Sequence, residues 1–428
     1  MIKSLLTKVF DQDNKNVFWS FASKGFAAVA FILVDVFLAR MLQLEQYGEW
    51  QYFYSTLSIA FVVTYFGIPQ ASQTYAARYN GKPELRSVIT SSLLLRLLVS
   101  VIFTAVMMVL RSPLATLIDQ PDFAPLLLLS GPLIFLMGIS EYLKNVFVGL
   151  KAAVYHFVMN VFEFGIKLGM VIMLLSMANQ LSSVVNAYTS AVLVSVVAGL
   201  IILFYVFRKA VNDAGDAGGH QRFLKEIWRY SLPLSLISIG FIVMTELNTQ
   251  MLGVLTTERE VAVFGVGKQL TNKLPQISLA LSMGTMPEFA QITAGEMQEK
   301  KKKFYRLLQV NLLIFVPIVA GIILLSPLAI PLVYGPDYRE AVLPLQILSL
   351  RLLISTSIIF ANSFLDYQGA AKKRAFNFSI SILCDVLLNL YLIPRYGAIG
   401  AAVATTVSYI PYLVLNMLEV RRLFNRVE

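Results

Sequence analysis

One stretch of the chain, residues 261–293, combines an apolar composition with polar side chains on one helical face. At about 100° per residue, five polar side chains cover an arc of roughly 140°, and the opposite face is apolar. They are Lys268, Gln269, Asn272, Lys273 and Gln276. Ammonium and carboxamide groups bind anions and hydroxyl-rich molecules by hydrogen bonds, so we expect a ligand-binding surface. The alternative is that these groups hold neighbouring helices together.

Two apolar stretches contain residues that interrupt helices. Pro275 lies inside the polar run and lacks the backbone N–H that a helix requires, so we expect a bend there. The stretch 48–76 is also polar on one side, and its Gly67-Ile68-Pro69 sequence predicts a second break. Both stretches are therefore expected to form bent helices.

Charged residues occur inside other apolar stretches, where a charge is costly. Glu163 and Lys167 lie four residues apart on one helix face, which predicts mutual neutralisation. Lys24 is a candidate third cation for the binding surface. Asp35, Glu246 and Glu163 are candidates for binding H⁺ or Na⁺; no other cofactor and no metal site is expected.

Three further patterns contain residues that could bind an ion, a phosphate or a substrate. Asp385 and Asn389 share a helix face and predict either an ion site or simple packing. Gly265-Val266-Gly267-Lys268 lacks the strand and the Ser/Thr of a phosphate loop. His156 and His220 are far apart, and neither has a nucleophile nearby in sequence; His220 is expected in a solvated loop. We therefore do not expect an enzyme.

The elements that carry these residues are membrane helices. Apolar residues make up 57% of the 428 residues and charged residues only 14%, against roughly a quarter in soluble proteins. The apolar residues form long runs, and about 20 such residues cross a bilayer. Twelve spans are expected, at 17–39, 48–76, 88–110, 123–150, 154–177, 183–207, 227–255, 261–293, 304–325, 341–367, 376–393 and 399–420.

The lysines and arginines support this topology. Of the 35 cations, 23 fall on the side of the N-terminus and five on the opposite side, so both termini and the polar connector 208–229 are expected in the cytoplasm. This asymmetry explains the net charge of +10 without a nucleic-acid partner. The single cysteine excludes a disulfide framework.

The two halves of the chain repeat each other. Ser-Pro-Leu-Ala at 112–115 recurs at 326–329, and Pro-Asp-Phe at 121–123 recurs as Pro-Asp-Tyr at 336–338. Because each half has an even number of spans, the repeat is parallel, and a binding cavity is expected between the halves near the membrane midplane. The expected domains are a six-helix bundle at 1–207, the connector at 208–229 and a second bundle at 230–428.

Several short motifs carry a family resemblance. They are Leu-Ala-Arg-Met-Leu at 38–42, Gln-Tyr-Gly at 46–48, Gly-Ala-Ala-Lys at 369–372 and Leu-Ile-Pro-Arg-Tyr-Gly-Ala-Ile-Gly-Ala-Ala at 392–402. In this order they resemble the motifs of the polysaccharide-biosynthesis flippases, a family of the MATE-like MOP superfamily. Members of this family transport O-antigen or capsule units. The resemblance covers essentially the whole chain.

The resemblance implies an all-α membrane fold of two six-helix bundles around a central cationic cavity, in the bacterial inner membrane. It implies a flippase that moves undecaprenyl-diphosphate-linked oligosaccharide to the periplasmic leaflet by alternating access. Membrane lipids and polysaccharide-assembly proteins are the implied partners. Two alternatives remain: a multidrug/cation antiporter of the same fold, and a membrane polysaccharide polymerase or ligase.

Overall fold

The computed structural model describes residues 12–178, 180–211, 220–289 and 296–426, and this part of the chain contains helices and no strand. The chain divides into two compact units. Unit 1 comprises Met1–Leu42 and Phe53–Glu246, and unit 2 comprises Gln43–Tyr52 and Leu247–Glu428. The start of α3 and the end of α11 thus belong to unit 2, and the rest of both helices to unit 1.

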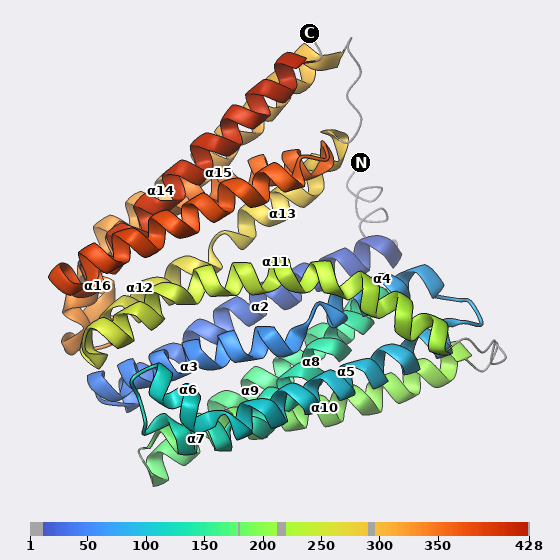
Figure 1. Cartoon of the computed structure of the whole chain (residues 1–428), viewed down its shortest axis with the longest axis horizontal. Coiled ribbons are helices and arrows are strands. Elements are labelled where there is room, and N and C mark those ends of the chain that lie inside the picture. Colours follow the sequence, from blue (N-terminus) through green and yellow to red (C-terminus); the bar gives the residue numbers. More distant parts are fainter. Residues whose placement is uncertain (1–11, 179, 212–219, 290–295, 427–428) are drawn as a thin grey trace, which may run out of the picture. The chain divides into compact units, whose positions relative to one another are not determined.

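Unit 1 is built from long helices joined by short turns (Figure 1). Helix α9 packs against α2 and α10, and α8 packs against α4, α5 and α10. The helices are α2 (Gln12–Met41), α3 (Leu44–Tyr65), α4 (Ile68–Tyr79), α5 (Leu85–Val109), α6 (Arg111–Leu117), α7 (Phe123–Leu129), α8 (Gly131–Gly149), α9 (Ala153–Met177), α10 (Leu181–Val211) and α11 (His220–Leu255).

In unit 2, α15 packs against both α14 and α16. The elements are α12 (Glu258–Lys273), α13 (Gln276–Thr285), the 3₁₀ helix η1 (Met286–Phe289), α14 (Met297–Val333), the 3₁₀ helix η3 (Pro336–Ala341), α15 (Val342–Tyr367) and α16 (Ala371–Arg426). Gly397 divides α16 into two helices, because its backbone is not helical (φ 50°, ψ −128°).

Eight of the described helices are long and apolar enough to cross a bilayer, or ten when each of two bent pairs counts as one span. The pairs are α3 with α4, bent by 43°, and α7 with α8, bent by 44°. The protein is therefore a multi-pass membrane protein. The count of twelve spans stays a prediction, because α16 covers two expected spans and α12 with α13 falls outside the set.

Both predicted helix breaks are present. α3 ends at Tyr65 and α4 begins at Ile68, and between them Phe66 and Gly67 have positive φ angles of 48° and 66°. A Cβ atom on Gly67 would lie 2.5 Å from the Ser231 carbonyl oxygen, so this position requires glycine. The second break separates α12 from α13 at Pro275.

The stretch 208–229 is more helical than a solvated connector. α10 continues to Val211 and α11 begins at His220, while residues 212–219 lie outside the described part. The expectation that His220 lies in a loop is wrong, because it is the first residue of α11, and its carbonyl accepts a hydrogen bond from Ser91 Oγ (3.1 Å). The domain division 1–207, 208–229 and 230–428 stays a prediction.

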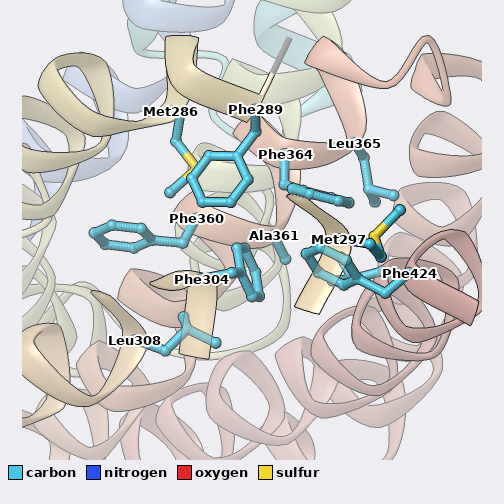
Figure 2. Packing of buried hydrophobic residues seen from close by; sticks show 11 residues of the cluster. Met286, Phe289, Met297, Phe304, Leu308, Phe360, Ala361, Phe364, Leu365 and Phe424 are labelled. Carbon is cyan, nitrogen blue, oxygen red and sulfur yellow. The ribbon is translucent and has the colours of Figure 1, made fainter. Parts of the chain in front are cut away.

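Aromatic side chains hold one end of unit 2 together (Figure 2). Phe289, Phe304, Phe364 and Phe424 come from η1, α14, α15 and α16, and all four are buried. The Phe364 ring lies 4.7 Å from the Phe424 ring and 5.2 Å from the Phe304 ring. Such ring pairs add to the stabilisation from apolar burial, so these elements are fixed to one another at this end.

Candidate functional site

Unit 1 contains a cavity of about 280 Å³ whose wall is formed by α2, α3, α8, α9 and α10. Polar and charged side chains dominate one part of the wall. They are Lys24, Tyr54, Glu141, Lys144, His156, Asn160, Glu163, Lys167 and Tyr188. A polar cavity inside a membrane-embedded unit is costly to maintain, which makes it the candidate functional site.

An ion-pair chain lies along this wall. Glu163 on α9 accepts a hydrogen bond from Lys144 Nζ (2.8 Å) and forms a longer pair with Lys167 Nζ (3.5 Å). Lys144 also pairs with Glu141 (3.6 Å), and Ser140 Oγ donates to Glu163 Oε2 (3.3 Å). The predicted pair of Glu163 with Lys167 is present, but the shorter bond joins α8 to α9. Within this ion-pair chain, the charges of Lys144 and Lys167 are balanced by those of Glu141 and Glu163.

The other polar groups of the cavity differ in the contacts that they make. Lys167 Nζ lies over the rings of Phe164 (4.7 Å) and Tyr188 (4.4 Å), so cation–π contacts offset part of its desolvation. Asn160 Nδ2 donates to Ser23 Oγ on α2 (2.8 Å). His156 lines the same cavity, and its buried Nδ1 atom has no hydrogen-bond partner among the described residues.

His156 and Asn160 were not among the predicted site residues. A signal for them exists, because positions 156, 160, 163 and 167 recur at helical spacing and therefore share one face of α9. A nucleophile close in sequence to a histidine is a signal for a catalytic site, and that criterion does not detect the alignment of His156 and Asn160 with the Glu163–Lys167 pair.

The four candidate residues of unit 1 form two groups, one in the cavity lining and one outside it. Lys24 and Glu163 line the cavity itself. Asp35 is buried on α2 and Glu246 lies on α11, and neither belongs to the cavity lining. Tyr54 links the groups, since its hydroxyl lies within electrostatic range of Asp35, Glu163 and Glu246.

The candidate residues of unit 2 lie on α12 and at the start of α13. Lys268 is only 6% exposed and donates to Thr249 Oγ1 (2.8 Å), and Gln269 donates to Gln51 Oε1 (3.0 Å). Asn272 Oδ1 accepts a hydrogen bond from Arg351 Nη2 (2.6 Å).

The rest of the predicted polar face is interrupted. Lys273, which is half-buried, is the last residue of α12. Gln276 is exposed and begins α13 after the break. The face therefore runs continuously from Lys268 to Lys273 and not to Gln276. Its role in ligand binding stays a prediction.

Asp385 and Asn389 lie in a buried polar cluster of unit 2. Asp385 Oδ1 accepts from Ser408 Oγ (3.1 Å), and Asn389 Nδ2 donates to Asn248 Oδ1. Asp385 Oδ2 and Asn389 Oδ1 have no hydrogen-bond partner among the described residues. The two interpretations drawn from the sequence, an ion site and packing, both remain open for this cluster.

The short motifs near residues 47 and 397 have a packing role in unit 2. A Cβ atom on Gly48 would lie 1.8 Å from the Glu258 carbonyl oxygen, so glycine lets the start of α3 approach α12 closely. Glu260 Oε2 accepts a hydrogen bond from the Ala398 backbone N–H (2.6 Å) directly after the break at Gly397. The carboxylate thereby satisfies a free N–H at the start of a helix.

The arrangement of helices is that of MATE transporters. A multidrug resistance MATE family transporter of the MOP superfamily, solved in an inward-facing conformation, aligns with a TM-score of 0.77 at 15% identity, covering 95% of this chain and 98% of that one. A MOP superfamily transporter from Pyrococcus furiosus aligns with a TM-score of 0.66 at 16% identity, covering 97% of each chain. These likenesses define the class by its fold: a multi-pass, helical membrane protein of MATE-like fold.

The sequence comparison defines the family. The "Polysaccharide biosynthesis protein" family matches residues 14–293, and this chain belongs to that family. The "Probable low-salt glycan biosynthesis flippase Agl15" of Haloferax volcanii is 25% identical over 45% of this chain and 41% of its own length. The "Capsular polysaccharide biosynthesis protein CapF" of Staphylococcus aureus is 28% identical over 47% and 51%. The match thus spans about half or less of the length of these two relatives.

Proposed function

We propose that this protein is a flippase that moves an undecaprenyl-diphosphate-linked oligosaccharide, an O-antigen or capsule repeat unit, from the cytoplasmic to the periplasmic leaflet. The observation that carries the proposal is the polar, lysine-containing cavity inside a membrane-embedded unit of a polysaccharide-biosynthesis protein. The named flippase and capsule relatives support the substrate class.

The physical task explains why such a cavity is needed. Each unsatisfied hydroxyl of a glycan costs a few kcal/mol in an apolar medium, and an unpaired phosphate charge costs far more. Hydroxyl, amide, imidazole and ammonium groups in the cavity replace the lost water contacts. The lipid tail needs no such replacement, because it can stay in the bilayer.

The cations have a specific part in this proposal. Within the ion-pair chain, Lys144 and Lys167 are balanced by Glu141 and Glu163, so Lys24 adds net positive charge to the wall. Lys24 is therefore the residue of unit 1 proposed to attract the diphosphate or an acidic sugar. Lys268 and Lys273, with Gln269, Asn272 and Gln276, are the proposed contacts from unit 2.

The driving ion is proposed to bind near Tyr54. Asp35, Glu163 and Glu246 all act electrostatically on this tyrosine, which supports the proposal that the three candidate carboxylates serve one ion site. H⁺ and Na⁺ are distinguished by imposing a pH gradient or a Na⁺ gradient separately across proteoliposomes. The ion that drives transport in the wild type, and fails to drive it after neutralisation of these acids, is the coupling ion.

The topology belongs to the same proposal. Twelve spans in two parallel six-helix bundles would place both termini and the connector 208–229 in the cytoplasm of a bacterial inner-membrane protein. Reporter fusions after Val211 and at Glu428 test this placement. A periplasm-active phosphatase that works at either point would contradict it.

One experiment separates the proposed function from its alternatives. Purified protein in proteoliposomes receives a fluorescent lipid-linked oligosaccharide, and its movement between leaflets and its chain length are both followed. Flipping without chain lengthening supports the proposal, whereas lengthening indicates a polymerase. Export of a cationic dye without glycan movement indicates the multidrug antiporter, which the acids around Tyr54 and the MATE fold favour as the second candidate.

A further inference from the structure

Arg96 is a charged residue that the proposed binding site leaves unexplained. It lies within α5, a predicted membrane span, and its exposed fraction is 0%. Among the described residues, no carboxylate forms an ion pair with it. A buried charge at such a position is expensive and calls for a specific role.

The guanidinium is bonded to backbone carbonyl groups. Nη1 donates to the carbonyl oxygens of Thr64 (2.5 Å) and Tyr65 (3.2 Å), the last two residues of α3. Nε donates to the carbonyl oxygen of Gly138 on α8 (3.0 Å). One side chain from α5 thus joins the end of α3 to α8.

The break after α3 explains why two of these acceptors are available. In an uninterrupted helix, the Tyr65 carbonyl would accept from the residue four positions later, but that residue is Pro69, which has no N–H. Phe66 and Gly67 have positive φ angles and turn the chain out of the helix. Inside a membrane, freed carbonyls must find another donor in the protein, and Arg96 supplies it.

The other end of the contact adjoins the cavity. Gly138 follows Met137 and precedes Glu141 by one turn, and both of these residues line the unit 1 cavity. A Cβ atom on Gly138 would lie 2.0 Å from Arg96 Nη2, so the close approach requires glycine. The position of α8 in the cavity wall therefore depends on its hydrogen bond to the Arg96 guanidinium.

We propose that Arg96 is a positioning residue that holds the broken end of α3 and the α8 wall of the cavity in one arrangement. The guanidinium suits this task because its rigid fork reaches acceptors in several directions, whereas a lysine ammonium is a single point at the end of a flexible stem. The inference rests on the proposed function only in treating the cavity as the transport site.

Thiol labelling in native membranes tests the proposal without a substrate. Cys384, the single native cysteine, is replaced by serine, and Met137→Cys on α8 or Ala27→Cys on α2 reports on two parts of the same cavity wall. With Arg96→Lys, we expect the labelling rate at Met137→Cys to change by about three- to tenfold, the range that packed neighbours transmit. The rate at Ala27→Cys should change by less than about twofold, because the hydrogen bonds of Arg96 to described residues go to α3 and α8 and not to α2.

A second variant disturbs the same contact while keeping the charge. Gly138→Ala pushes the guanidinium aside and should change Met137→Cys labelling in the same way, even if Arg96→Lys fails to fold. Gly165→Ala on α9 is the matched control, since its Cβ would meet no atom within 4 Å. Unchanged labelling at Met137→Cys in both variants, or equal changes at both reporters, overturns the proposal. Absence of flipping by the wild type would instead refute the proposed function and leave the labelling result intact.

Discussion

The two units stabilise their buried cations differently. In unit 1, Arg96 binds backbone carbonyls at the end of α3, and Lys144 binds the carboxylate of Glu163. In unit 2, Arg351 donates to the side chains of Asn272 (2.6 Å) and Thr271 (3.4 Å) and lies over the Tyr409 ring (5.5 Å). Each arginine lies beside a helix break, α3/α4 or α12/α13.

The difference has a consequence for function. A cation that bonds to backbone carbonyls or to a carboxylate keeps its position regardless of which polar side chains lie nearby. A cation bonded to an amide of the proposed substrate face changes its partner when that amide binds something else. We therefore expect the buried cations of unit 1 to keep their partners, and the Arg351–Asn272 contact of unit 2 to change when Asn272 binds another group.

The largest expected effect concerns the charges of unit 1. Glu163→Gln leaves Lys167 buried without its carboxylate and Lys144 with only its longer pair to Glu141 (3.6 Å), and an uncompensated buried charge costs about 3–5 kcal/mol. Protein level and thermal stability in membranes should fall sharply. Adding Lys167→Gln should recover most of the loss, because Lys144 keeps its pair with Glu141 (3.6 Å).

The control is Glu163→Gln with Lys144→Gln, which leaves Lys167 buried with no ion pair to a carboxylate among the described residues and should recover less. Normal protein level with abolished transport in Glu163→Gln alone would contradict the structural role. That result would point to H⁺ coupling at this carboxylate.

The next effect compares the two breaks. Gly67→Ala forces a Cβ against the Ser231 carbonyl in a left-handed conformation, which should destabilise the fold by about 3 kcal/mol or more. Pro275→Ala restores a backbone donor and should change stability by no more than about 1 kcal/mol. Melting temperatures of the purified variants measure both. Equal melting temperatures would mean that the two breaks are equivalent.

A smaller effect separates the two arginines. Arg351→Gln and Asn272→Ala should be non-additive, with a coupling of about 1–2 kcal/mol, since the two side chains bond each other. Arg96→Lys and Thr64→Val should be additive within about 0.5 kcal/mol, because Arg96 bonds the backbone of Thr64 and not its hydroxyl. Double-mutant cycles on thermal stability provide the test. Strong coupling in the second cycle would remove the distinction.

The smallest change in stability is expected on the proposed substrate face. Lys268→Ala and Lys273→Ala should leave the protein in the membrane but lower glycan export by about tenfold, as for loss of a charge-assisted hydrogen bond. Conversion to glutamate should be worse, because it repels the diphosphate, and conversion to arginine should partly restore export. Full export by a well-expressed Lys268→Glu, Lys273→Glu double variant would make these lysines packing residues.

Composition and spacing alone determined much of this protein. Long apolar runs must be helices in a membrane, because only local hydrogen bonding satisfies the backbone there. The same local logic located the breaks at Gly67 and Pro275, since both depend on backbone properties of single residues. It also paired Glu163 with Lys167, four positions away on one helix.

The partners that buried charges find on other helices were decided only by the tertiary structure. Lys144 lies 19 positions from Glu163, and Arg96 lies 32 positions from Thr64, so their bonds depend on which helix faces meet. For the same reason, the sequence predicted Lys268, Gln269 and Asn272 as one polar face but not their bonds to Thr249, Gln51 and Arg351. Spacing along a helix determines which side chains share a face, whereas the packing of several helices determines what that face contacts.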